Sequence, residues 1–167
     1  MRKRQKGFSL IELLIVVAII LIIAAIAIPN LMRSRMAANE ASAAGSLRTI
    51  NTAEVTYSTT YGTGFAPLAN LGGASPCTAA AATACLIDPV LTVGAKSGYQ
   101  VATSAPAALG TVAAPNVTYE VSAVPLAAGQ SGQRSFCTDQ SGVIRADPAG
   151  SAAPATCAGA AAYLPIQ

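Results

Sequence analysis

The sequence of 167 residues contains no histidine and no tryptophan, and charged residues make up only 10% of it. Soluble domains usually contain about 25% charged residues. Histidine is the side chain that most often transfers protons or binds metal ions near neutral pH. Without it, and with seven acidic residues scattered along the chain, the commonest catalytic and metal-binding patterns are missing. We therefore predict that the protein is not an enzyme and uses no cofactor or metal ion.

Positive charge is scarce after the first six residues. The chain has ten cations and seven acids, but four of the cations are Arg2, Lys3, Arg4 and Lys6. Without these four, six cations face seven acids. The basic isoelectric point therefore comes from the first residues, and we predict no direct nucleic-acid binding.

An apolar run occupies residues 8–28, in which Ser9 and Glu12 are the only polar residues. A helix of this length spans about 31 Å, close to the hydrocarbon thickness of a bilayer. Its Phe, Leu, Ile and Val residues favour insertion by about 4–9 kcal/mol, which exceeds the cost of about 3 kcal/mol for one carboxylate. The run therefore predicts a helix that spans a membrane.

The charges on the two sides of the run predict its orientation. Four cations precede it, and two, Arg33 and Arg35, follow it closely. Loops with more lysine and arginine stay in the cytoplasm. We expect a single pass with the N-terminus in the cytoplasm and the rest of the chain outside.

Three interpretations of this segment compete. A plain membrane anchor explains the apolar run but gives Glu12 no purpose. A cleaved secretory signal would use the small residues "AIA" that end at Ala27, but such signals usually have apolar regions of about 7–15 residues. A leader cut after Gly7 would place a new amine on Phe8, one helical turn from Glu12. That carboxylate could then pair with the amine of an adjacent identical helix, and we favour this interpretation because an acid inside a membrane needs a partner.

The stretch "KGFSLIELLIVVAIILIIAAIAIPN" at residues 6–30 resembles the N-terminal motif of type IV pilins and type II secretion pseudopilins. The resemblance implies that a prepilin peptidase cuts after Gly7, that Phe8 is N-methylated, and that Glu12 guides assembly. Pro29 matches the family's helix proline, which would kink or loosen the helix. One departure is Leu21, which stands where many pilins have glycine.

The same resemblance implies a structural subunit of a type IV pilus, made as a prepilin in the bacterial inner membrane and polymerised through its N-terminal helix into an extracellular filament. Its partners would be identical subunits, the prepilin peptidase, the inner-membrane assembly platform and membrane lipid. The alternative within the family is a pseudopilin of a type II secretion system. An enzyme on a membrane tether is the alternative from another class.

The fold expected from this resemblance and from the residue pattern is α+β, a type IV pilin-like lollipop. Residues 1–7 form the leader, residues 8–29 the membrane and polymerisation helix, residues 30–60 its amphipathic second half, and residues 61–167 a head. An apolar stripe at helical spacing predicts that the second half packs on a sheet. The stripe consists of Leu47, Ile50, Tyr57 and Tyr61.

The head is expected to contain a small antiparallel sheet. Residues 62–96 are rich in Gly, Ala, Pro and Thr and are interpreted as an irregular connection. Residues 117–124 alternate as a half-buried strand does, with Val117, Tyr119, Val121 and Ala123 on one side. The strand candidates are residues 98–104, 117–124, 134–139 and 142–146. The turn "DQSG" at residues 139–142 makes the last two a hairpin, and the tail from Pro148 is expected to be a loop.

Four cysteines allow three disulfide pairings. Their spacing lacks the paired CxxC pattern of a zinc or thioredoxin site. We favour Cys77 with Cys85 and Cys137 with Cys157, because each bond closes a short loop with little regular structure. The loop-entropy relation assigns these closures about 2.6 and about 3.3 kcal/mol. A bridge near the C-terminus also resembles the bridged loop of type IVa pilins, and with the lack of an acidic calcium loop it favours the pilin over the pseudopilin.

Two weaker signals remain in the head. Asp139 and Asp147 lie in the part where major pseudopilins carry a calcium site, but two acids eight residues apart make a poor calcium cage. We interpret them as turn-capping residues. The sequence "NVT" at residues 116–118 fits the N-glycosylation pattern, and inside a predicted strand we interpret it as a chance match.

Overall fold

The computed structural model describes residues 9–150, 157 and 163–166. They form an α+β fold in which helix α1 (Leu10–Tyr61) is followed by two short helices and an antiparallel sheet. The chain divides into two compact units, Met1–Arg35 and Met36–Gln167. The first contains the start of α1, and the second contains the rest of α1 with the sheet. The predicted long helix is confirmed from Leu10 onward.

Within the second unit, α1 buries the apolar stripe that the sequence predicts. Leu47, Ile50 and Tyr57 are fully buried, and Tyr61 is partly buried against the same core. Their spacing of three, four and seven residues places them on one side of the helix. The core that they enter also contains Val121 from the sheet. The prediction that this half of the helix packs on a sheet is confirmed.

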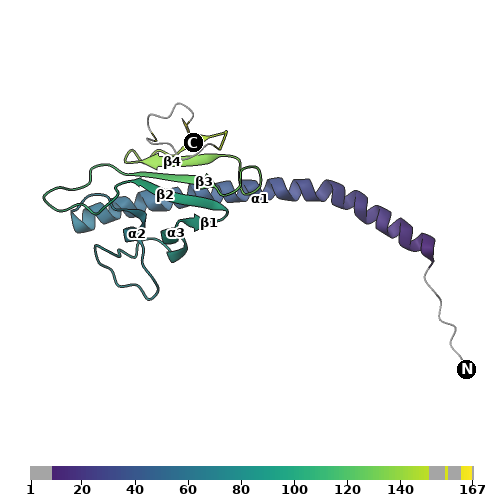
Figure 1. Ribbon diagram of the computed structural model, residues 1–167, viewed down its shortest axis with the longest axis horizontal. Helices are drawn as coiled ribbons and strands as arrows, with labels where there is room; N and C mark the ends of the chain where they lie inside the picture. The colour runs from purple at the N-terminus through teal and green to yellow at the C-terminus, as the bar shows by residue number, and fades with distance from the viewer. Residues whose placement is uncertain (1–8, 151–156, 158–162, 167) are drawn as a thin grey trace, which may run out of the picture. The chain divides into compact units, whose positions relative to one another are not determined.

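The sheet has six strands that pair in the order in which they occur along the chain. Figure 1 shows β2, β3 and β4 side by side along the later part of α1. All five pairings are antiparallel. The strands are β1 (Ala95–Lys96), β2 (Tyr99–Ala105), β3 (Glu120–Pro125), β4 (Ser135–Asp139), β5 (Arg145–Asp147) and β6 (Leu164–Pro165).

Strand β3 is shorter than its sequence pattern suggests. Tyr119, Val121 and Ala123 are buried, as the alternation predicts. Val117 is 74% exposed, so its predicted burial is wrong. The strand begins at Glu120 because pairing with β2 ends there, after a register shift between Thr103 and Ala105. The alternation of residue types therefore continues further than the hydrogen-bonded ladder.

The connection after α1 is more regular than expected. Helices α2 (Leu68–Leu71) and α3 (Pro89–Val93) and strand β1 all lie within residues 62–96. At the start of α3, the carboxylate of Asp88 accepts a hydrogen bond of 2.8 Å from the amide of Leu91, and Pro89 occupies the first turn. Gly94 ends the helix with φ of +85°, a conformation that glycine adopts without strain. The sequence "DPVLTVG" carries these start and stop signals, so this part of the irregular assignment is wrong.

Strands β4 and β5 form the predicted hairpin. The amide of Gly142 donates a hydrogen bond of 2.8 Å to the carbonyl of Asp139, which closes the predicted turn. The tail was expected to be a loop from Pro148 onward, yet Leu164–Pro165 pairs with β5 as strand β6. Residues 151–156, 158–162 and 167 lie outside the described residues.

All five residues of β4 are buried, because both faces of the strand are covered. Phe136 faces the main core. Cys137 faces the other way and packs with Cys157 and Tyr163 in a second apolar cluster. The hydroxyls of Ser135 and Tyr163 share a hydrogen bond of 2.6 Å. Cys157 and Tyr163 of the tail thus cover the face of the sheet that points away from α1.

Candidate functional site

The first part of α1 presents an apolar surface that no part of the described chain covers. Between Leu10 and Ile28 the exposed fractions of the large side chains run from 44% at Val17 to 76% at Leu10. An 18-residue window has a mean hydropathy of 3.3, and none of it is buried. Soluble monomers seldom expose apolar patches larger than a few hundred Å². By length and composition, this helix can cross a membrane.

The helix satisfies its own backbone, as a lipid environment requires. Residues Leu10–Tyr61 form one continuous α-helix, and the amide of Leu13 donates a bond of 3.2 Å to the carbonyl of Ser9 at the start. Lipid supplies no hydrogen bonds to exposed backbone groups. Pro29 lies inside the helix and lacks an N–H, so the carbonyl of Ala25 loses its donor four residues later. Whether this loosens the helix stays a prediction.

Glu12 is the one ionisable side chain in this apolar surface. It lies exposed in the first turn of α1, between Ile11 at 65% exposure and Leu13 at 56%. The positive end of the helix dipole favours a carboxylate there. The structure gives Glu12 no ion pair among the residues that it describes. Gly7 and Phe8 lie outside the described residues, so the proposed pairing of Glu12 with a Phe8 amine is not tested.

In the second unit, Glu40 joins α1 to the segment that precedes β4. Its carboxylate accepts hydrogen bonds from the amides of Gln133, at 2.9 Å, and Arg134, at 3.1 Å. It also forms a salt bridge of 2.8 Å with the Arg134 guanidinium. Burial raises the pKa of Glu40, but the bonds from Gln133 and Arg134 outweigh it, and the pKa is lowered overall. The sequence gave no sign of this contact. Glu40 is a charged residue among small residues of a helix, and such a residue is expected to be exposed.

Glu54 is a second buried carboxyl that sequence reasoning missed. It is fully buried in the core, where its Oε2 accepts a hydrogen bond of 2.9 Å from the amide of Ala66. Its Oε1 has no hydrogen-bond partner within the described structure. Burial raises the pKa of Glu54 to about 7, although the bond from Ala66 opposes this shift. Glu54 lies between Ile50 and Tyr57 on the buried stripe, and this position could have predicted its burial.

A partly buried polar network joins α1 to the sheet. The Asn51 amide nitrogen donates to the Thr138 hydroxyl at 3.0 Å and to the Gly142 carbonyl at 3.1 Å. Its amide oxygen accepts a bond of 3.0 Å from the Tyr119 hydroxyl. Burial raises the pKa of Tyr119 to about 12, with a smaller contribution from the charge of Glu54. Asn51 is not one of the residues of the apolar stripe, yet it joins α1 to β4 and to Tyr119.

Two disulfides close the two loops that the sequence favours. Cys77 is bonded to Cys85, with their Cα atoms 6.0 Å apart, and Cys137 to Cys157, at 5.8 Å. The second bond is buried, since each of its cysteines is 1% exposed. The first lies at the surface, with Cys77 exposed and Cys85 half-buried. The bonds therefore differ in their access to solvent.

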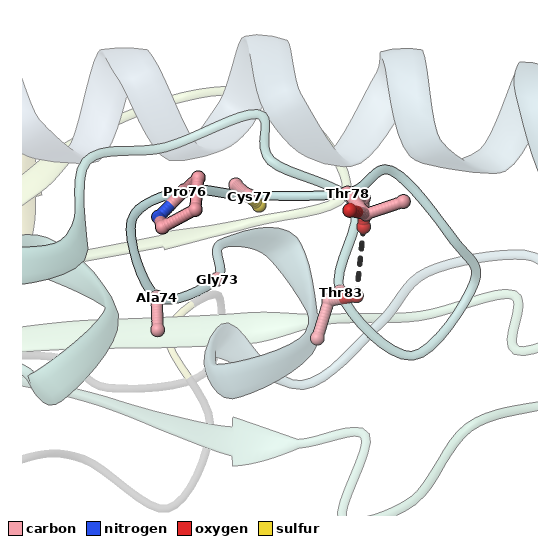
Figure 2. A pocket seen from close by; sticks show the side chains of 6 residues that line it. All are labelled: Gly73, Ala74, Pro76, Cys77, Thr78 and Thr83. Carbon is pink, nitrogen blue, oxygen red and sulfur yellow. Dashed lines mark hydrogen bonds between the residues drawn. The ribbon is translucent and has the colours of Figure 1, made fainter.

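A shallow pocket lies beside the first disulfide. Figure 2 shows that its lining comes entirely from the connection between α2 and α3, where the Thr83 hydroxyl donates a bond of 3.1 Å to the Thr78 carbonyl. The lining residues are Gly73, Ala74, Pro76, Cys77, Thr78 and Thr83. None of these side chains carries a charge, so the pocket offers no general acid or base.

Asp139 and Asp147 cap turns, as the sequence suggests. Asp139 accepts a hydrogen bond of 2.9 Å from the amide of Ser141 and forms a salt bridge of 3.1 Å with Arg145. Asp147 accepts a bond of 2.9 Å from the amide of Ala149. Among residues 9–150, 157 and 163–166, no three His, Cys, Asp or Glu side chains gather as a metal site would require.

Comparison with known proteins connects the apolar segment to a recognised motif. A family profile described as the prokaryotic N-terminal methylation motif matches residues 2–28. Similar proteins include the type IV wide pilus major component PilA4 of Thermus thermophilus, 60% identical over 38 residues. The type IV major pilin protein PilA of Myxococcus xanthus is 46% identical over 54 residues.

These matches are short. They cover 23% and 32% of this chain, and 29% and 24% of the two relatives. The chain thus matches less than a third of the length of each relative. No solved structure matches the chain. The chain carries a prokaryotic N-terminal methylation motif and is similar to type IV pilins over the matched segments.

Proposed function

We propose that the protein is the structural subunit of a type IV pilus. It is made as a prepilin, cleaved after Gly7, N-methylated at Phe8 and held in the inner membrane by residues 8–29 until it polymerises. The leader stays in the cytoplasm and the head lies outside. The filament consists of identical subunits, and the prepilin peptidase and the inner-membrane assembly platform act on the subunit before assembly.

The observation that carries this proposal is the uncovered apolar surface between Leu10 and Ile28 on a chain with the methylation motif. Such a surface has two stable surroundings, which are lipid and other apolar helices. One kind of contact repeated between identical subunits builds an open helical filament when it does not close into a ring. The same surface can therefore serve first as the membrane anchor and then as the filament core.

Glu12 gives the assembly its register. In the membrane its carboxylate lies near the edge of the apolar run, and in the filament it pairs with the Phe8 amine of a neighbouring subunit. In the low-dielectric interior of the filament, each of the two charges is stabilised by the other. Removal of one partner leaves a buried charge, which costs about 3–5 kcal/mol. One carboxylate per subunit therefore selects one stagger between neighbouring helices.

The alternative is a pseudopilin of a type II secretion system. The matched curated relatives are named as pilus components, which supports the pilin. Deletion of the gene separates the two functions. Loss of surface filaments with normal protein secretion supports the pilin, whereas normal filaments with loss of secretion would require the pseudopilin.

The test of the proposed function uses substitutions at Glu12. Glu12→Ala, Glu12→Leu and Glu12→Gln should all insert normally and be processed, because each removes a charge from the apolar run. Each should reduce the filaments sheared from cells while the membrane pool rises. Glu12→Gln is the sharpest variant, since it keeps the shape and removes only the charge.

Ser9→Ala is the matched control, because Ser9 is the other polar residue of the run and carries no charge. It should leave filament yield unchanged. If all three Glu12 variants also gave normal filaments, Glu12 would have no role in assembly. If the protein formed no filaments at all in wild-type cells, the pilus function itself would be wrong.

A further inference from the structure

The ion pairs of the chain leave one group of cations unused. After the six-residue basic start, the chain has six cations, and three of them form salt bridges in the second unit. The bridges are Lys96–Asp88, Arg134–Glu40 and Arg145–Asp139. The other three cations, Arg33, Arg35 and Arg48, are exposed on α1 and form no salt bridge within the described chain.

A second copy of the chain has little to offer these arginines. All seven acidic side chains lie within the described residues, and three are already in salt bridges. Glu54 is fully buried and Asp147 is 2% exposed. Glu120 accepts hydrogen bonds from the amide of Cys157 and the hydroxyl of Ser104, and Glu12 lies in the apolar run. A second copy therefore has few free carboxylates for these arginines, which favours an anion from outside the protein.

Two of the three arginines follow the apolar run closely enough for their side chains to reach lipid headgroups. Arg33 and Arg35 follow the last residue of the apolar run, Ile28, by about 8 Å and about 11 Å along the helix axis. The headgroup region extends about 5–8 Å beyond the hydrocarbon on each side. Side chains on a helix point back toward its N-terminus, so both guanidinium groups can reach into that region. Arg48 follows Ile28 by 20 residues in the sequence and belongs to the second unit, so it does not adjoin the apolar run.

The two arginines also point to different sides of the helix. Positions two residues apart are separated by about 200° around the axis. Arg33 and Arg35 therefore reach headgroups on nearly opposite sides, which opposes both sliding and tilting of the helix. A guanidinium presents paired donors that match the oxygens of a phosphate group.

We propose that Arg33 and Arg35 bind the phosphates of anionic phospholipid headgroups at the extracytoplasmic face of the membrane. This inference rests on the proposed membrane insertion and adds a lipid contact to it. The two arginines fix the depth of the subunit before assembly, and the contact has to break when the subunit leaves the membrane for the filament.

The test measures lipid selectivity. The full chain is reconstituted in phosphatidylcholine vesicles that contain spin-labelled phosphatidylglycerol or spin-labelled phosphatidylcholine. The ratio of motionally restricted lipid reports the preference of the protein for the anionic headgroup. A cation near an anionic surface contributes a factor of about five in affinity. Arg33→Gln should therefore lower the preference for phosphatidylglycerol severalfold. The double variant, Arg33→Gln with Arg35→Gln, should remove most of the preference that the cations of the leader do not cause.

Two further variants make the result specific. Arg33→Lys with Arg35→Lys keeps both charges and should retain most of the preference. Arg48→Gln removes another exposed cation without a salt bridge, one that does not adjoin the apolar run, so it should leave the preference unchanged. The four cations of the leader are the same in every variant and cancel in the comparison. High salt should reduce the preference of the wild-type chain, since screening weakens surface charge pairs.

The outcomes separate this inference from the proposed function. Flotation of the vesicles first establishes whether each variant is inserted. Normal insertion with an unchanged preference in the double glutamine variant would overturn the headgroup contact and leave the pilin proposal standing. An equal loss in Arg48→Gln would overturn it as well, because position would then not matter. Failure of the wild-type chain to insert would overturn both.

Discussion

The carboxylate of Glu54, fully buried in the core, accepts a hydrogen bond of 2.9 Å from the amide of Ala66. The two residues join the end of α1 to the segment that enters α2. One carboxylate oxygen is satisfied by this bond, and the other has no partner within the described structure. A buried carboxyl in this position is easier to keep neutral than charged.

The stability of the head should therefore fall as the pH rises. Burial raises the pKa of Glu54 to about 7, from an ordinary value of 4.5. A group whose pKa is raised on folding stabilises the fold fully below its unfolded pKa, and this contribution is lost as the pH rises through the folded pKa. Between pH 5 and pH 8 we expect the unfolding midpoint of the full chain in detergent to fall by several degrees.

Glu54→Gln tests this pH dependence, because glutamine cannot ionise and can still accept the bond from Ala66. The variant should show a flatter dependence of the midpoint on pH between 5 and 8, measured by circular dichroism. Glu40→Gln is the control, since the pKa of Glu40 is lowered and its titration lies below this range. An identical slope in wild type and Glu54→Gln would show that Glu54 is not the group responsible.

The contact between Glu40 and Arg134 predicts an asymmetric pair of substitutions. Glu40→Ala removes the acceptor for the amides of Gln133 and Arg134 and should destabilise the head by about 1–3 kcal/mol. Arg134→Ala leaves both amide bonds and removes a side chain that is 47% exposed, so it should cost about 1 kcal/mol or less. Urea unfolding of the full chain measures both. Equal losses would mean that the salt bridge, rather than the two amides, gives Glu40 its importance.

The two disulfides should differ in how readily they are reduced. The bond between Cys77 and Cys85 lies at the surface, whereas Cys137 and Cys157 are each 1% exposed. A thiol has to reach the sulfur atom that it attacks. Under native conditions, dilute dithiothreitol followed by alkylation should label Cys77 and Cys85 first. Simultaneous labelling of all four cysteines would show that the head opens before either bond is reduced.

Loss of the buried bond should have the larger effect on stability. Replacement of Cys137 and Cys157 by alanine should cost about 3.3 kcal/mol and release the tail from β4, against about 2.6 kcal/mol for the other pair. Non-reducing peptide mapping should link the cysteines as described above. A peptide that joins Cys85 to Cys137 would contradict both the loop-closure argument and the structure.

Processing of the leader is tested by mass. We expect the purified protein to have the mass of residues 8–167 plus one methyl group. Gly7→Leu should leave a longer, membrane-bound precursor, because a bulky side chain would obstruct the peptidase at the scissile bond. A mature chain that begins at Met1 or after Ala27 would contradict the assignment of Gly7 and Phe8.

Periodicity predicted the parts of the fold that depend on one-sided burial. The stripe through Leu47, Ile50 and Tyr57 and the alternation through Val121 and Ala123 both reflect a core on one side of an element. The turn from Asp139 to Gly142 was also predicted, because its residues have distinct backbone preferences. These signals depend on residues that are close in the sequence, so they can be identified without knowledge of the tertiary contacts.

Features that depend on distant partners could not be predicted. Glu40 and Glu54 are acids on a helix. Their burial depends on hydrogen bonds from the amides of Gln133 and Ala66, which are distant in the sequence. Val117 fits an alternating strand but lies beyond the last pairing with β2. The short strand β6 depends on the pairing of Leu164 with Ala146 of β5, which comes 18 residues earlier in the sequence. The N-terminal motif was recognised from its residues, yet Gly7 and Phe8 lie outside the described structure.

The order of the strands has a consequence for export. On the proposed orientation, each strand after β1 meets a partner that has already crossed the membrane, because the strands pair in chain order. Among the described strands, β1 alone waits for a later one, and short-range pairings of this kind form quickly. Helix α1 also waits: it crosses before the sheet, and Leu47 and Tyr57 face solvent until β3 and β4 follow. We therefore expect the sheet to grow strand by strand during translocation, with the earliest exported part of the head the last to be enclosed.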